Sequence, residues 1–247
     1  LLNSPFIDEI VGRPTYLKAE CLQHSGSFKF RGAFSAISAL TSEERDKGIL
    51  AYSSGNHAQG IALAATMHNI PSTVIMPEDA PKIKIDNTRK LGAEVLLYDR
   101  YNESREVIGE NLQKKFGSVI KKPYDEPNVI AGQGTLMREF LEQAPDLSTV
   151  VVAIGGGGLA AGTVLAADGR RVVGVEPEGA PTMARAFEND APITLSEIDT
   201  VAADALGAGT AGQLTFSICK AGLDRVELVK DAHLLDAQKW LWQHLRI

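Results

Sequence analysis

Short apolar runs alternate along the chain with segments in which apolar residues recur at the three- and four-residue spacing of a helix. Continuous apolar runs are typical of strands buried on both faces of a sheet, and the segments between them are typical of helices that cover those faces. The predicted strands are residues 49–52, 72–76, 94–98, 149–154 and 171–175. The predicted helices are residues 60–65, 81–91, 102–116, 158–166 and 232–245. The pattern therefore predicts an α/β fold built on parallel sheets.

No internal repeat or low-complexity linker marks a domain boundary in the sequence. The strand and helix patterns between residues 48 and 125 nevertheless form a continuous block. We therefore expect a small domain at residues 48–125 and a large domain made of residues 1–47 and 126–247. The last predicted helix is followed by neither a cap nor a polar tail, so we expect that sequence is missing beyond it.

Composition adds no element to this prediction, but it excludes several classes of partner and location. The chain has 247 residues, of which 44% are hydrophobic and 23% charged, as in ordinary soluble globular proteins. Its net charge of −6 argues against nucleic acid and anionic membranes as partners. We find no signal peptide and no apolar run long enough to span a bilayer, and we expect Cys21 and Cys219 to be buried free thiols. A reducing cytoplasmic location is the default expectation.

Lys29 lies in the segment SGSFKFRGA (residues 25–33), between two phenylalanines and with a glycine three residues away on either side. A lysine on the surface is protonated and is a poor nucleophile, but burial lowers the pKa of the amine. The aromatic neighbours favour burial, and the glycines leave room for a bulky ring. The alternative is a surface lysine whose stem lies on apolar neighbours. Within this segment we favour a nucleophilic amine.

The segment SSGNHAQG (residues 53–60) follows a predicted strand and opens a helix. Hydroxyl groups, an amide and unpaired backbone N–H groups at a helix N-terminus form a receptor for a carboxylate. The alternative is a plain helix cap made by Ser54 or Asn56. The density of polar side chains favours a ligand site.

Four consecutive glycines, Gly155 to Gly158, join a predicted strand directly to an alanine-rich helix. Their spacing is not GxGxxG and no Walker lysine accompanies them, which argues against a nucleotide-binding Rossmann protein. Bare backbone amides at the positive end of a helix fit a phosphate dianion, whereas a flexible connector, the alternative, has no evident use there. A nucleophilic amine together with a phosphate cradle predicts a phosphorylated aldehyde, pyridoxal phosphate, as the ligand.

These three motifs, in this order, closely resemble those of the pyridoxal-phosphate-dependent threonine/serine dehydratases, which share their fold with serine racemase, cysteine synthase and the tryptophan synthase β-subunit. The resemblance runs over nearly the whole chain. It implies two lobes, each a mostly parallel twisted sheet flanked by helices, with the cofactor in the cleft between them. It also implies that the large domain binds the cofactor and is incomplete at both ends.

The resemblance further implies roles for individual residues. Lys29 matches the lysine that forms the Schiff base with the cofactor and then carries the α-proton, and Ser54 matches the second acid or base of racemases. The implied cofactor contacts are Phe28 beside the ring, Asn56 at the ring 3-oxygen, and Gly155, Gly156, Gly157 and Gly158 at the phosphate. The implied substrate contacts are Ser53, Ser54, Asn56 and His57 at the carboxylate, with Arg105 near the substrate.

Glu176 and Ala180 match two ligands of the family's cation site, the first by its side chain and the second by its carbonyl. Mg²⁺ or another divalent or monovalent cation is therefore a candidate ligand. The third ligand is usually acidic, but this chain has Thr182. From the residues alone, a solvated carboxylate at the end of a strand is an equally good interpretation of Glu176.

The expected activity is dehydration and deamination of L-threonine or L-serine to a 2-keto acid and ammonia. The alternatives are a serine or hydroxyaspartate racemase/dehydratase, a β-replacement enzyme of the same fold, and a non-catalytic amino-acid-binding remnant. The expected partner is a small hydroxy amino acid, and the resemblance implies a homo-oligomer.

Overall fold

The computed structural model describes residues 1–247 and confirms the α/β class, with parallel sheets flanked by helices. Contacts within the chain divide it into two compact units. We call His24–Gly132 the lysine unit, and Leu1–Gln23 together with Gln133–Ile247 the glycine unit. No helix has the length and apolar character needed to cross a membrane.

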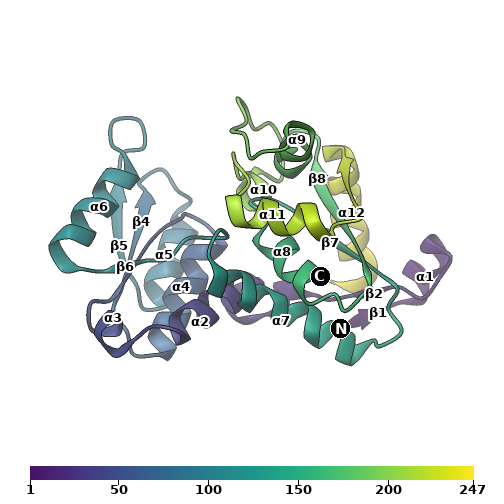
Figure 1. Cartoon of the computed structure of the whole chain (residues 1–247), viewed down its shortest axis with the longest axis horizontal. Helices are drawn as coiled ribbons and strands as arrows, with labels where there is room; N and C mark the ends of the chain where they lie inside the picture. Colours follow the sequence, from purple (N-terminus) through teal and green to yellow (C-terminus); the bar gives the residue numbers. More distant parts are fainter. The chain divides into compact units, whose positions relative to one another are not determined.

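The lysine unit contains a four-stranded parallel sheet in the order β5-β4-β3-β6 (Figure 1). Its strands are β3 (Ile49–Tyr52), β4 (Ser72–Pro77), β5 (Glu94–Tyr98) and β6 (Val119–Ile120). Its helices are the 3-10 turn η2 (His24–Gly26), α2 (Lys29–Ser38), α3 (Ser42–Asp46), α4 (Asn56–Met67), α5 (Lys82–Lys90), α6 (Arg105–Phe116) and the first residues of α7 (Pro127–Gln143).

Helices cover both faces of this sheet, as the continuous apolar strands predict. Successive side chains of a strand point to opposite faces. Ala51 of β3 belongs to a core cluster with residues of α2 and α4, whereas its neighbour Leu50 packs with Ile108 and Leu112 of α6. The end of the sheet at which β3 stops is therefore held between packed helices.

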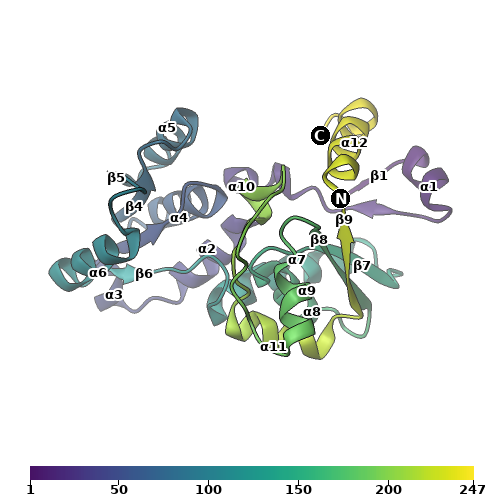
Figure 2. The ribbon, with the colours of Figure 1, turned by 90° about the horizontal axis from the view of Figure 1, so that it is seen from above.

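The glycine unit contains a three-stranded parallel sheet in the order β7-β8-β9, whose strands lie side by side in Figure 2. The strands are β7 (Thr149–Ala153), β8 (Arg171–Pro177) and β9 (Arg225–Val229), beside a small antiparallel pair, β1 (Leu2–Asn3) and β2 (Tyr16–Leu17). The helices are α1 (Pro5–Val11), the 3-10 turn η1 (Glu20–Leu22), the rest of α7, α8 (Gly158–Leu165), α9 (Thr182–Asn189), α10 (Ala203–Leu206), α11 (Gln213–Gly222) and α12 (Asp231–Leu245).

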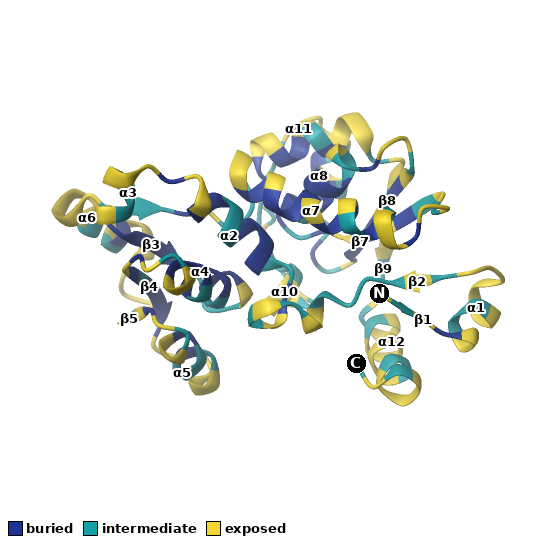
Figure 3. Cartoon of the chain, turned by 90° about the horizontal axis from the view of Figure 1, so that it is seen from below, coloured by how far each residue is buried: buried dark blue, intermediate teal, exposed yellow.

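Burial within the glycine unit is uneven (Figure 3). Strand β8 and helix α8 are mostly buried, whereas α1 and α12 contain no buried residue. The two exposed helices touch through the rings of Phe6 and His244, whose centroids lie 5.1 Å apart. The core that supports the glycine loop is therefore formed around β8 and α8.

The boundaries between the contact units differ from those of the expected domains, which were residues 1–47 with 126–247 and residues 48–125. The expected small domain lies inside the lysine unit, which also includes α2 and the start of α7. The lysine unit extends beyond the expected small domain because the backbones of α4 and α7 pack closely against α2. A methyl group on Gly60 of α4 would stand 3.2 Å from the backbone of Lys29, and one on Gly132 of α7 would clash with the carbonyl oxygen of Arg31 at 2.4 Å.

Candidate active site

Lys29 is the first residue of α2 and follows a tight turn. Ser25 and Gly26 both have positive φ angles, of 56° and 76°, and this turn brings Phe28 to the start of the helix. Lys29 as a whole residue is half-buried, and its amine donates a hydrogen bond of 2.9 Å to the carbonyl oxygen of Pro123 and lies 5.3 Å from the centre of the Phe28 ring. Burial lowers the pKa of Lys29 from 10.5 to about 8.

Two hydroxyl groups beside this lysine have no hydrogen-bond partner although they are buried. They are Ser25 Oγ and Ser27 Oγ, and Ser27 is 6% exposed. Buried polar groups in proteins are normally paired, so an unpaired buried hydroxyl group is free to bind a water or a ligand atom. This part of the lysine unit therefore fits a polar ligand next to a reactive amine.

The segment after β3 leaves the N-terminus of α4 without a side-chain cap. The cap residue is Gly55, and neither Ser54 nor Asn56 caps the helix. Ser53 Oγ instead accepts a hydrogen bond from the Gly55 N–H at 3.2 Å. The helix-cap interpretation of this segment is therefore wrong, and first-turn amides of α4 remain for a carboxylate ligand.

His57, the second residue of α4, is buried, and its Nε2 lies 3.0 Å from the carbonyl oxygen of Lys121. Burial and the charge of Lys29 lower the pKa of His57 to about 4, against a smaller opposite effect of the hydrogen bond to Lys121. The ring is therefore neutral at pH 7. Because a carbonyl can only accept, Nε2 carries the proton and donates it to Lys121.

Arg105 opens α6 and lies over the ring of Tyr52, with 5.8 Å between the guanidinium carbon and the ring centre. Its side chain is 49% exposed, and its Nε donates to Glu106 at 2.8 Å. Tyr52 is the last residue of β3 and directly precedes Ser53. The guanidinium group therefore lies beside the strand end that leads into the predicted carboxylate-binding segment.

In the glycine unit, the four glycines connect β7 to α8 in a mostly buried turn. At one of these four positions, Gly157, no larger residue fits. Gly157 has a φ of +92°, and a methyl group there would come within 2.8 Å of Met183 and 2.9 Å of Thr215. The carbonyl of Gly156 is fixed on α11, because it accepts hydrogen bonds from Thr215 Oγ1 at 2.7 Å and from the Gly212 N–H at 3.3 Å. The first amides of α8 have no intrahelical acceptors, so the turn fits an anion.

Glu176, at the end of β8, is fully buried, so the interpretation as a solvated carboxylate is wrong. Its two oxygens accept hydrogen bonds from the N–H groups of Met183, at 2.7 Å, and Ala184, at 2.9 Å, in the first turn of α9. Burial raises its pKa to about 7, and these two hydrogen bonds oppose the rise. Glu176 thus caps a helix.

The other residues of the expected cation site also have protein partners. Thr182 Oγ1 donates to the carbonyl of Ala208 at 2.6 Å, and the carbonyl of Ala180 accepts from the Thr182 N–H at 2.9 Å. No cluster of three or more histidine, cysteine or acidic side chains has the arrangement of a metal site. Both Glu176 oxygens serve the start of α9 and the Ala180 carbonyl already accepts a hydrogen bond, so these contacts add no support for the expected cation site, which stays a prediction.

The structure therefore distributes the predicted site residues over both units. Lys29, Phe28, Arg105 and the segment 53–57 belong to the lysine unit, and Gly155–Gly158, Glu176 and Ala180 belong to the glycine unit. Sequence reasoning missed Pro123, because a backbone carbonyl has no residue-type signature. The only signal was a turn with two prolines, residues 121–127, after a short apolar pair.

Comparison with known proteins identifies the family. The model of a pyridoxal-phosphate-dependent enzyme family matches residues 1–247. An L-threo-3-hydroxyaspartate ammonia-lyase of Saccharomyces cerevisiae is 40% identical, over the whole of this chain and 77% of its own. The structure of maize serine racemase superposes with a TM-score of 0.96 and 37% identity, over all of this chain and 75% of that one.

The structure of a threonine deaminase from Solanum lycopersicum also superposes on this chain, with a TM-score of 0.94 and 35% identity. The match covers all of this chain and 73% of the deaminase chain. The relatives thus include both ammonia-lyases and racemases, and the residues found here fit the cofactor that defines their family: a buried amine of lowered pKa and a glycine turn that suits a phosphate. The chain belongs to the pyridoxal-phosphate-dependent enzymes, within the group of ammonia-lyases and racemases.

Proposed function

We propose that the chain is an ammonia-lyase that converts L-threonine or L-serine to a 2-keto acid and ammonia. The observation that carries the proposal is the state of the Lys29 amine, which meets the neutral carbonyl of Pro123 and has a pKa of about 8. At pH 7 about one such amine in ten is neutral, compared with about one in three thousand at a pKa of 10.5. Lys29 is thus prepared both to attack an aldehyde and to accept a proton.

In this proposal, Lys29 would hold pyridoxal phosphate covalently, with Phe28 beside the ring, Asn56 at the ring 3-oxygen and Gly155–Gly158 at the phosphate. When bound, the cofactor supplies an electron-withdrawing ring that stabilises negative charge at the substrate α-carbon. The glycine turn supports this assignment, because its carbonyl side is engaged by α11 while the first amides of α8 are left for an anion.

The substrate carboxylate would bind the uncapped first turn of α4, with Ser53 and Ser54 as neighbouring hydroxyl donors. Once the substrate amine has displaced it from the cofactor, the neutral Lys29 amine would take the α-proton, and the β-hydroxyl would leave with one further proton as water. Hydrolysis of the dehydrated product consumes one water and releases the 2-keto acid and ammonia. Ser54 is the candidate for the second acid or base.

The test is an assay of keto acid after the chain is mixed with pyridoxal phosphate and L-threonine or L-serine. We expect keto acid from the wild type and none from Lys29→Ala. Formation of D-serine in place of pyruvate would make the chain a racemase. A requirement for sulfide or another added nucleophile would make it a β-replacement enzyme. A dialysed chain that neither holds nor takes up the cofactor would be an amino-acid-binding remnant.

A second candidate substrate, L-threo-3-hydroxyaspartate, is favoured by one observation and by the names of two relatives. A β-carboxylate needs a cationic partner, and Arg105 presents a half-exposed guanidinium group over Tyr52, close to the predicted carboxylate segment. Arginine binds carboxylates in a fixed two-donor geometry. This substrate would use the same elimination as threonine or serine.

Comparison of kcat/KM for L-threonine and L-threo-3-hydroxyaspartate, in wild type and in Arg105→Met, distinguishes the two candidates. If Arg105 binds the β-carboxylate, the substitution lowers kcat/KM for hydroxyaspartate by about ten- to a hundredfold, the range of a charge-assisted hydrogen bond. The value for threonine then changes little. An equal loss for both substrates would remove the support for hydroxyaspartate.

A further inference from the structure

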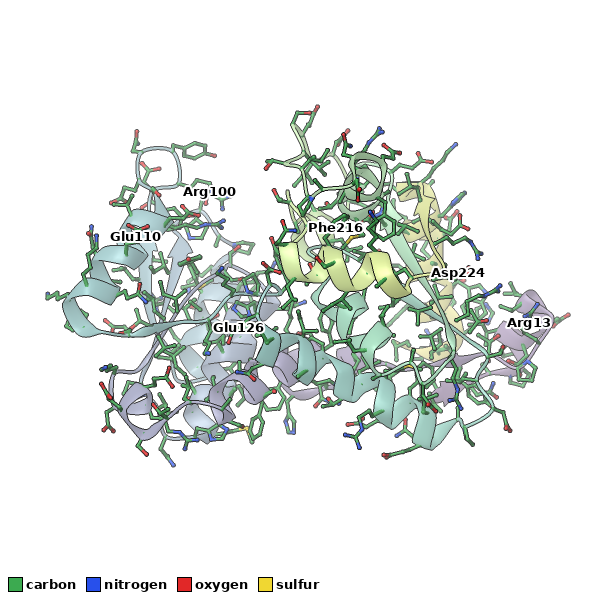
Figure 4. The ribbon with its side chains drawn as sticks, in the orientation of Figure 1. Arg13, Arg100, Glu110, Glu126, Phe216 and Asp224 are labelled. Atoms are coloured by element: carbon green, nitrogen blue, oxygen red, sulfur yellow. The ribbon has the colours of Figure 1, made fainter.

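The acceptor of the Lys29 hydrogen bond lies on a short loop, residues 121–126, between β6 and α7. The contacts that hold this 121–126 loop include three made by charged or histidine side chains. Lys29 Nζ donates to the Pro123 carbonyl at 2.9 Å, and His57 Nε2 donates to the Lys121 carbonyl at 3.0 Å. Lys121 Nζ forms an ion pair of 2.7 Å with Glu126, which is labelled in Figure 4 just before α7.

The ion pair joins the two ends of the loop and is mostly buried. The side chains of Lys121 and Glu126 are 8% and 18% exposed, so the pair is largely shielded from solvent and is screened less than a surface ion pair. The Lys121 N–H also donates to the carbonyl of Leu50 at 3.0 Å, which anchors the start of the loop to the sheet. Glu44 also interacts electrostatically with Lys121.

His57 completes this arrangement from the side of α4. Its ring is buried and, with a pKa of about 4, stays neutral over the range in which the enzyme would work. A neutral donor is suited to a backbone carbonyl, because it fixes that carbonyl without adding a positive charge next to the Lys29 amine. The charged groups that bear on this arrangement include Lys29 itself, Lys121, Glu126 and Glu44, and Asp125 and Arg105 act on Tyr124 in the same loop.

We infer that His57 is a positioning residue for Lys29: by its hydrogen bond to Lys121 it holds the 121–126 loop so that the Pro123 carbonyl meets the Lys29 amine. The family resemblance implies that His57 contacts the substrate carboxylate. Our inference gives it a different partner, the carbonyl of Lys121. The inference rests on the proposed catalytic role of Lys29. Its test does not, since the position of the amine can be measured without substrate.

The first measurement is the pKa of Lys29 in the full chain without cofactor, from NMR of reductively ¹³C-methylated lysines, with Lys29→Arg to assign the signal. Burial lowers this pKa, so water admitted by a loosened loop should raise it, and this effect should exceed the opposite one from losing the hydrogen bond to the Pro123 carbonyl, which favours the charged amine. We expect His57→Leu, which has no donor, to raise the Lys29 pKa by roughly 1 unit. His57→Gln keeps an N–H donor and should retain most of the wild-type value.

Two further variants test the inference even if His57→Leu fails to fold. Glu126→Gln removes the ion pair at the other end of the loop and should raise the Lys29 pKa in the same direction. His68→Leu replaces the histidine at the opposite end of α4, which contacts Ser38, and should leave the Lys29 pKa unchanged. A wild-type pKa in both His57→Leu and Glu126→Gln would overturn the inference.

Steady-state kinetics then separate positioning from substrate binding. A positioning residue acts on proton transfer, so His57→Leu should lower kcat about tenfold or more with KM changed less than about twofold, and His57→Gln should restore most of kcat. A raised KM with unchanged kcat would instead assign His57 to the substrate carboxylate. If the chain has no lyase activity, the NMR titration still decides the positioning role.

Discussion

Gly60 of α4 lies against the backbone of Lys29, so closely that a methyl group on Gly60 would stand 3.2 Å from the Lys29 carbonyl carbon. The two helices therefore meet at the residue proposed to carry the cofactor. Backbone cannot yield as a flexible side chain can, so this contact fixes where α2 begins relative to α4. The same α4 carries His57, whose partner loop offers the acceptor for the Lys29 amine.

Gly60→Ala should destabilise the chain by about 1 kcal/mol, because an overpacking cost of about 1–3 kcal/mol exceeds the gain in helix propensity of just under 1 kcal/mol. Urea unfolding followed by circular dichroism measures this difference. Gly209→Ala is the matched control, since a methyl group there would meet only Ile198, at 3.9 Å. Equal stability of Gly60→Ala and wild type would mean that the two helices are not locked at this point.

Gly157→Ala should impair the binding of a phosphate group. The substitution forces alanine into a left-handed conformation at φ +92° and against Met183 and Thr215, at a cost of about 1–3 kcal/mol. We expect the affinity for pyridoxal phosphate to fall about tenfold or more, and the affinity for pyridoxal, which lacks the phosphate, to change little. Equilibrium dialysis with both ligands measures the two affinities. A parallel loss of both would contradict the phosphate assignment.

Lys29→Met should abolish activity and yet stabilise the fold at neutral pH. The pKa of Lys29 falls from 10.5 in the unfolded chain to about 8 in the folded one, so folding disfavours the charged form. This cost is fully present below pH 8 and disappears as the pH rises from 8 to 10.5. The methionine variant should therefore exceed the wild type in unfolding free energy by about 1–3 kcal/mol at pH 7. The difference should shrink toward pH 10.5.

A constant difference in unfolding free energy between pH 7 and pH 10.5 would show that Lys29 is charged in a solvated setting. Lys47, an exposed lysine paired with Glu43, provides the control, because its replacement by methionine should change stability by less than about 1 kcal/mol at any of these pH values.

Glu176→Ala should destabilise the chain by about 2–4 kcal/mol, because it leaves two N–H groups at the start of α9 without their acceptor. If these hydrogen bonds account for Glu176, addition of a chelator leaves the thermal unfolding of the wild type unchanged. A chelator effect as large as that of the substitution would instead reveal a cation held by Glu176.

The sequence predicts the parts of the fold in which each strand is a continuous apolar run. The strands at residues 49–52, 72–76, 94–98, 149–154 and 171–175 and the final helix are all confirmed. Strand β9 (Arg225–Val229) was missed because its polar residues alternate with apolar ones, as on a half-exposed strand, and β6 (Val119–Ile120) because it has only two residues. Of the two free thiols, Cys219 is buried, but Cys21 is exposed, so that prediction was half wrong.

The candidate site was predictable at the level of residue types and less so at the level of partners. Lys29 and the glycine turn have signatures in their neighbours along the chain. The hydrogen bond from His57 to Lys121 joins residues 64 positions apart, and the burial of Glu176 depends on α9, so neither follows from local pattern. The site roles, the domain boundaries, a homo-oligomeric state and a cytoplasmic location stay predictions.

The most direct test of the central claim is to mix the chain with pyridoxal phosphate, reduce the complex with borohydride, and locate the phosphopyridoxyl group by peptide mass spectrometry. We predict a single modified site, Lys29, and no stoichiometric label in Lys29→Ala. Label on another lysine, or none in the wild type, would contradict the account.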